Sequence, residues 1–109
     1  MFKIALSDTY TWPVTVDLAE DGGKRHKATF DAEFKRVSQE RVDQLVTEPP
    51  GDKALADEVM VGWSGVYDAN DQELPYSEEN RAKLLSITGV RAAIVRSFFD
   101  SLSGAPRKN

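Results

Sequence analysis

The sequence predicts an α+β fold, in which an N-terminal antiparallel β-hairpin or small sheet is followed by about four helices packed on it. Apolar and polar residues alternate from Trp12 to Leu18 and again from Ala28 to Phe34, as they do in half-buried strands. The turn sequence Ala19–Gly23 lies between these two stretches, which predicts a hairpin. Beyond Ser38 the apolar residues recur at helical spacing instead.

Length and composition indicate one ordinary globular domain. The chain has 109 residues, of which 40% are hydrophobic and 29% are charged. We expect residues 1–102 to form a single α+β domain and residues 103–109 to form a flexible C-terminal tail. The chain has no cysteine, which excludes disulfides and thiolate metal sites. No apolar run approaches the ~20 residues of a membrane helix, and no signal peptide is predicted, so no membrane partner is expected.

The charge is unevenly distributed along the chain. The net charge is −4, and residues 37–86 carry four basic and eleven acidic side chains. Nucleic-acid grooves need clustered Lys and Arg to neutralise phosphates, so the acidic middle argues against a nucleic-acid partner.

The strand predictions differ in strength. Residues 1–6 are predicted to form a short strand or an ordered arm. Pro13 cannot donate to a strand ladder, which predicts that it lies at a strand start or on a sheet edge. In the second strand the side chains of one face alternate between small and large, which leaves room for a helix to dock there; they are Ala28, Phe30, Ala32 and Phe34.

Helix boundaries follow from capping residues. Ser38 is a candidate N-cap for a short helix with an apolar stripe of Val42, Leu45 and Val46. Asp52 is a candidate cap for a second helix, which carries Leu55, Val59 and Met60 and for which Gly62 is the expected C-terminal glycine.

Two further helices are predicted near the C-terminus. Ser77 caps the third, with Glu78 and Glu79 in its first turn, where acidic residues suit the helix dipole. Thr88-Gly89 interrupts the pattern, and the last helix runs from about Val90 to Leu102 with a wide apolar face.

The stretch Val61–Asn80 is predicted to be a packing hub and not an active site. Two glycines flank a large Trp there, which suggests a backbone that bends tightly beside a large side chain. The hub residues are Gly62, Trp63, Gly65, Val66, Pro75, Tyr76 and Ser77.

No catalytic, cofactor-binding or metal-binding residues are assigned, and we expect a protein that is not an enzyme. His26 is the one histidine, and it lies between Arg25 and Lys27 on an expected exposed flank. The acids from Asp68 to Glu79 match the oxygen spacing of a calcium loop, but Glu73 stands where such a loop needs Gly. A small metal-binding or hydrolytic protein that uses these acids is therefore a minor alternative.

The last helix offers a candidate partner-binding surface. Phe98 and Phe99 are adjacent, and adjacent helical residues point about 100° apart, so both rings cannot face the same way. Either the domain buries both rings, or one belongs to a protein interface together with Val95 and Leu102.

Several segments resemble the tail assembly chaperones of long-tailed bacteriophages and prophages. The resemblance is carried by Gly62–Asp68 (GWSGVYD), Leu74–Asn80 (LPYSEEN), Leu84-Leu85, the Gly89-Val90 start of the last helix, and the Phe34–Ser38 passage. It covers the chain from about Ala28 to Leu102.

The resemblance implies a non-enzymatic assembly factor in the cytoplasm of the host bacterium. Such proteins bind the tape-measure protein, help to recruit tail-tube subunits, and are absent from the mature virion. Some members self-associate, and members are often made in two lengths by translational frameshifting. A small virion tail component is the main alternative.

Overall fold

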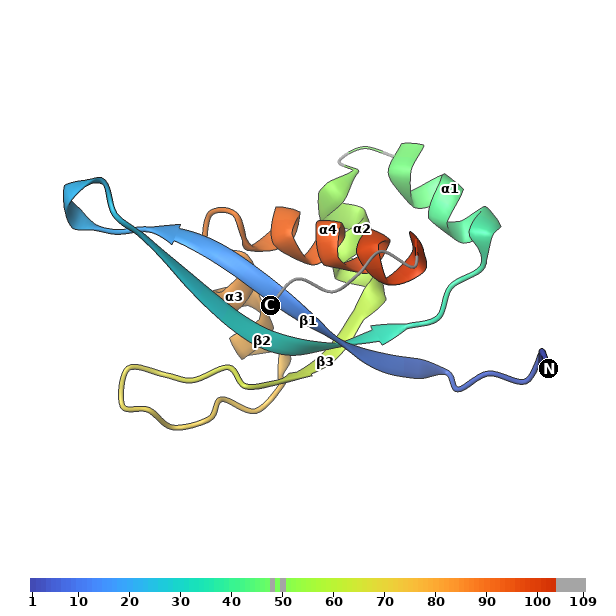
Figure 1. The fold of residues 1–109 in the computed structure, drawn as a ribbon, viewed down its shortest axis with the longest axis horizontal. Helices are drawn as coiled ribbons and strands as arrows, with labels where there is room; N and C mark the ends of the chain where they lie inside the picture. Colours follow the sequence, from blue (N-terminus) through green and yellow to red (C-terminus); the bar gives the residue numbers. More distant parts are fainter. Residues whose placement is uncertain (48, 50, 104–109) are drawn as a thin grey trace.

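The structure, a computed structural model, describes residues 1–47, 49 and 51–103, and it confirms the α+β class. A three-stranded antiparallel sheet is combined with four α-helices in the described part of the chain (Figure 1). In chain order the elements are β1 (Thr9–Ala19), a short 3-10 turn (Asp21–Gly23), β2 (Arg25–Lys35), α1 (Gln39–Thr47), α2 (Asp52–Val59), β3 (Met60–Ser64), α3 (Glu78–Leu85) and α4 (Val90–Ser103).

The predicted hairpin is confirmed as a long β1–β2 ribbon, and β1 is an edge strand because the strand order is β1-β2-β3. The Arg36 N–H donates to the Asp8 carbonyl at 2.9 Å. In an antiparallel ladder, hydrogen-bonded pairs alternate with pairs that are not hydrogen-bonded. The backbone N–H and C=O groups of even-numbered β1 residues therefore bond to β2, and those of odd-numbered residues point toward the open edge. Pro13, opposite Asp31, therefore has its nitrogen on the open edge, where no ladder donor is needed.

The sequence prediction for Gly62 was wrong. Helix α2 ends at Val59, and Gly62 lies inside β3, where it pairs with Glu33. The chain changes from helix to strand at Met60, because Met60 pairs with Phe34 and its side chain is buried. The register shifts between Glu33 and Phe34, so Val61 is the extra residue of a β-bulge.

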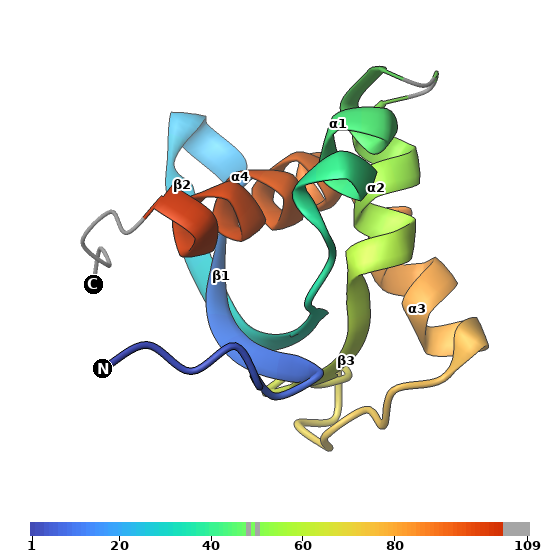
Figure 2. The ribbon, with the colours of Figure 1, turned by 90° about the vertical axis from the view of Figure 1, so that its right-hand side faces the viewer.

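Helix α4 covers the inner face of the sheet, with α1 and α2 beside it and α3 at the flank (Figures 1 and 2). Inner-face side chains that lie opposite one another on neighbouring strands form rows, and these rows pack against α4. In one row the buried Phe34 makes an edge-to-face contact with Tyr10 (6.0 Å between centroids) and another with Phe98 of α4 (5.4 Å). In the next row the fully buried Ala32 lies between its strand partners Trp12 and Trp63, so its small side chain leaves room for the two indole rings.

Two of the predicted N-caps are confirmed. The Ser38 hydroxyl accepts from the Arg41 N–H (3.1 Å), and the Ser77 hydroxyl accepts from the Asn80 N–H (3.1 Å). The cap prediction for Asp52 was wrong, because Asp52 is the first residue of α2 and Gly51 holds the N-cap position. Its side chain lies outside the described part of the structure.

The ends of the chain differ from the prediction in detail. Residues 1–7 form an extended arm outside any strand, Asp8 accepts a backbone bond from Arg36, and β1 begins at Thr9. Helix α4 includes Ser103, and residues 104–109 of the expected tail lie outside the described residues. Among the described helices, none has both the length and the apolar character needed to cross a membrane.

Candidate interaction surface

The structure divides the four predicted partner-binding residues of α4 into two pairs. Val95 and Phe98 are buried at 8% and 1% exposure, whereas Phe99 and Leu102 are exposed at 36% and 50%. The expectation that the two adjacent rings point apart is confirmed. Val95 and Phe98 stabilise the domain's own core, so the hypothesis of a partner surface is reduced to Phe99 and Leu102, which we call the α4 patch.

The α4 patch lies on a well-anchored helix end. The Phe98 ring packs on Phe34 and also lies 5.8 Å from the Phe99 ring in an edge-to-face contact. One turn further on, the Ser101 hydroxyl lies 2.7 Å from the Tyr10 hydroxyl, which links the end of α4 to the start of β1. These contacts hold the α4 backbone in place, so the patch is presented on a rigid element.

The predicted packing hub consists of a strand, a bend and a loop. Trp63 is half-buried; its indole N–H donates to the Leu74 carbonyl (2.9 Å), and its ring meets Tyr76 edge to face at 4.9 Å. The bend is at Gly65, which has a φ of +81°, and not at Gly62. The Tyr76 hydroxyl donates to the Met60 carbonyl at 3.3 Å, so the returning loop is fixed to β3.

The other hub residues differ in burial and in role. Val66 is half-buried, Pro75 is exposed, and Ser77 caps α3. The polar loop between them is closed by an Asx turn, because the Asp68 carboxylate accepts from the backbone N–H of Asn70 (2.8 Å) and of Gln72 (3.0 Å).

This use of Asp68 argues against the calcium-loop alternative. A calcium site needs several carboxylate oxygens gathered around one point. Among the described residues, no three His, Cys, Asp or Glu side chains are grouped as a metal site requires. The prediction for His26 is confirmed: its side chain is 59% exposed, with the Glu20 carboxylate 3.8 Å away.

A bidentate ion pair joins α1 to α2. Arg41 contacts the Glu58 carboxylate with two nitrogens, at 2.6 and 2.8 Å. This hydrogen bonding from Arg41 is the main cause that lowers the pKa of Glu58; burial opposes it, and the charges of Arg41 and Lys35 add to it. The pair holds α1 against α2, so we assign it to stability.

A second set of charges surrounds Asp57 in the same helix. Its carboxylate lies 3.0 Å from Lys53, 3.7 Å from Arg81 and 3.9 Å from Arg91. Arg81 also donates to the Asp57 carbonyl, which satisfies a carbonyl at the C-terminal end of α2. Arg81 thereby holds α3 against α2, and this too is a structural role.

Sequence reasoning missed a pocket and the exposure of the N-terminal arm. An open, mostly apolar pocket of about 190 Å³ lies between the far half of the β1–β2 ribbon and the α3–α4 corner. At the opposite end of the sheet the arm exposes Phe2, Ile4 and Leu6. Residues 1–6 were predicted to be a short strand or an ordered arm, but no local signal could indicate that the domain leaves their apolar side chains uncovered.

The three-stranded sheet and the four helices of the described residues define a small α+β protein that exposes the apolar α4 patch. A family model described as YdaY prophage protein matches residues 23–101, which is more than half of the chain. The chain therefore belongs to the YdaY prophage protein family. No curated protein and no solved structure matches it.

Proposed function

We propose that this prophage protein is a tail assembly chaperone that binds the tape-measure protein and helps to recruit tail-tube subunits. The proposal is for a non-enzymatic role in the host cytoplasm, with the protein absent from the mature virion. Membership of a prophage family supports the phage setting, and the resemblance of Gly62–Asp68 and Leu74–Asn80 to tail assembly chaperones supports the tail role.

The observation that carries the proposal is the α4 patch. Phe99 and Leu102 are three residues apart, so they are neighbours on one side of the helix. Their exposure of 36% and 50% leaves apolar area for a partner. The resemblance to tail assembly chaperones implies a partner with long hydrophobic helices, and an apolar helix face in contact with another helix is a common recognition mode.

Co-expression with tape-measure fragments from the same prophage tests the proposal. The wild-type chain should keep the fragments soluble and co-purify with them. Phe99→Glu should abolish co-purification while the thermal melt stays close to that of the wild type, because the ring is partly exposed. Val46→Glu on α1, at a residue that is 48% exposed, is the matched control and should still capture the fragments.

Two results would contradict the proposal. Unchanged capture by a folded Phe99→Glu variant would remove the α4 patch from the binding surface. Mass spectrometry that finds the chain in purified particles at the copy number of a structural subunit would favour the alternative, a small virion tail component.

A further inference from the structure

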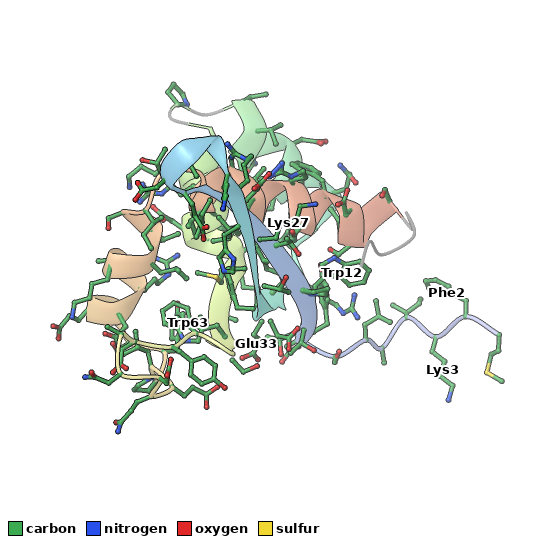
Figure 3. All side chains as sticks on the ribbon, turned by 60° about the vertical axis from the view of Figure 1, so that its left-hand side comes forward. Phe2, Lys3, Trp12, Lys27, Glu33 and Trp63 are labelled. Atoms are coloured by element: carbon green, nitrogen blue, oxygen red, sulfur yellow. The ribbon has the colours of Figure 1, made fainter. Side chains whose placement is uncertain are left out.

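The N-terminal arm (Met1–Ser7) has the pattern of a strand that lacks a sheet. Phe2, Ile4 and Leu6 are 84%, 90% and 57% exposed, and their spacing places them on one side of an extended chain. Figure 1 shows the arm leaving the domain at the end opposite to the hairpin tip, and Figure 3 shows Phe2 and Lys3 away from the rest of the molecule. Exposed apolar side chains at such spacing suit insertion into an apolar pocket.

The pocket of about 190 Å³, which we call the distal pocket, offers matching chemistry. Its walls include Leu18 of β1, Ala28 and Phe30 of β2, Val66 after β3, and Ile87 and Val90 at the α3–α4 corner. Phe30 and Val90 are buried, but Ile87 is 46% exposed. The pocket is therefore an apolar hollow that the domain lines but does not fill.

An unpaired strand edge runs beside the distal pocket. Strand β2 has 11 residues, but β3 pairs with it only from Asp31 to Phe34, within the residues that the structure describes. Even-numbered residues of β2 bond to β1, so Lys27 and Thr29 direct their backbone groups toward the side that β3 has left. An added strand there would align its inward side chains with Ala28 and Phe30.

The arm is too short to reach the distal pocket of its own chain. Arg36 holds its base, since its side chain donates to the Ser7 carbonyl (2.8 Å) and its N–H to the Asp8 carbonyl (2.9 Å). The six residues before Ser7 span at most about 22 Å. The chain is extended from Ser7 along β1, so at roughly 3.3 Å per residue the near wall of the pocket at Phe30, opposite Val14, lies about 23 Å from Ser7, and the far wall at Leu18 lies about 36 Å away. The tip of the arm could at most touch the near wall, and Ile4 and Leu6 cannot enter the pocket of their own chain. An arm that fills the distal pocket therefore belongs to a second copy.

The loop beside the distal pocket carries charge opposite in sign to that of the arm. Lys3 is the one charged side chain of the arm. The loop that leaves the pocket carries Asp68, Asp71 and Glu73 and has no basic residue between Gly65 and Ser77. A lysine that arrives beside this loop meets charges of opposite sign.

We propose that two copies exchange arms, and that the arm of each copy docks in the distal pocket of the other. Phe2, Ile4 and Leu6 fill the apolar hollow, and the arm backbone pairs with the open edge at Lys27 and Thr29. The two copies lie antiparallel, which brings each arm to the far end of its partner and closes the assembly as a symmetric dimer. The inference is independent of the tape-measure partner.

Disulfide trapping tests the contact directly, because the chain has no cysteine of its own. An Ile4→Cys variant is mixed with a mass-tagged Ile87→Cys variant of the full chain under mild oxidation. A disulfide between the two variants is expected. A mixture with Val46→Cys, which is on α1 and 48% exposed, is the matched control and should give at least tenfold less product. Equal yields from Ile87→Cys and Val46→Cys would overturn the proposal.

Analytical ultracentrifugation measures how much the arm contributes to the dimer dissociation constant. Ile4→Ser should raise the dimer dissociation constant at least tenfold, whereas Ala5→Ser, on the opposite side of the same arm, should change it by less than about threefold. Both variants should melt like the wild type, since the arm lies outside the core. The proposal is overturned if the wild type stays monomeric up to about 1 mM. Equal dissociation constants for Ile4→Ser and Ala5→Ser would overturn it as well.

Discussion

The two halves of the β1–β2 ribbon are built from the same alternating pattern but are covered very differently. In the near half, which contains Tyr10 and Phe34, the inner face is covered by the C-terminal part of α4, and β3 extends the sheet. In the far half, beyond Phe30, β3 has ended and the α3–α4 corner leaves the distal pocket open. Figure 2 shows α4 above the strands, with β3 and α3 on one side only.

The difference indicates that alternation makes a strand but does not determine what covers it. In the near half, the inner side chains pack against the helices of the domain and stabilise its core. The far half has apolar side chains and backbone groups left over, which is the condition for an interface.

Phe34 and Phe30 are a matched pair on the inner face of β2, one in each half. Phe34 is fully buried between Tyr10 and Phe98, whereas Phe30 is 7% exposed and lines the distal pocket. Removal of a ring creates a larger new cavity where the surroundings are closed. We expect Phe34→Ala to cost about 4–5 kcal/mol and Phe30→Ala about 3 kcal/mol. Urea denaturation measures both, and equal costs would mean that the halves are equally well packed.

Trp63 marks the boundary between the halves. Its ring is half-buried, and it links β3 to the loop through Leu74 and Tyr76. Trp63→Ala should cost about 2–3 kcal/mol, less than a fully buried ring. Trp63→Phe keeps an aromatic ring but loses the hydrogen bond to Leu74, and should cost about 1 kcal/mol. A Trp63→Ala melt that matches the wild type would show that the link contributes nothing.

The sequence predicted the elements better than their surroundings. The hairpin and the caps at Ser38 and Ser77 were found because period-two alternation and N-cap hydroxyls are local signals. Gly62 was misassigned because a glycine after an apolar run fits a helix end and a strand equally well; its pairing with Glu33 is a contact across 29 positions. Whether Phe98 or Phe99 is buried depends on where α4 docks, which no local pattern specifies.

Substitution of Gly62 and of Gly65 by Ala should destabilise the fold for different reasons. Gly65, where the chain leaves the sheet, has a φ of +81°, so Gly65→Ala should cost about 1–2 kcal/mol through backbone strain. Gly62 is extended, but an added Cβ would lie 2.5 Å from Glu33 Oε1. That carboxylate must then move and give up its bond from Thr9 (2.8 Å), at about 0.5–1 kcal/mol.

A double variant separates these two causes in the same denaturation experiment. Glu33→Ala should remove most of the extra cost of Gly62→Ala, because the obstructing carboxylate is gone. The same change should leave the cost of Gly65→Ala unaltered, since its strain is in its own backbone. Additive costs for Gly62→Ala with Glu33→Ala would show that Glu33 is not the obstacle.

The smallest expected effect concerns the Arg41–Glu58 ion pair, which joins α1 to α2. Arg41 lowers the pKa of Glu58, so the folded pKa lies below the unfolded one. The stability that follows is fully present above the unfolded value of about 4.3 and is lost as the pH falls through the folded pKa. Glu58→Gln should therefore cost well under about 1 kcal/mol at pH 7, because Arg41 is 37% exposed and solvent screens the pair.

The same difference should shrink as the pH falls below the unfolded value and through the lowered folded pKa of Glu58, because the wild-type carboxylate then becomes protonated and no longer pairs as an anion. Urea denaturation of the wild type and Glu58→Gln from pH 7 to pH 3 measures it. Glu79→Gln is the control, because the Glu79 side chain is 82% exposed and pairs with Lys83 at 3.5 Å, an arrangement that contributes little. A cost of Glu58→Gln that stays constant over this range would show that the charge of Glu58 does not stabilise the α1–α2 contact.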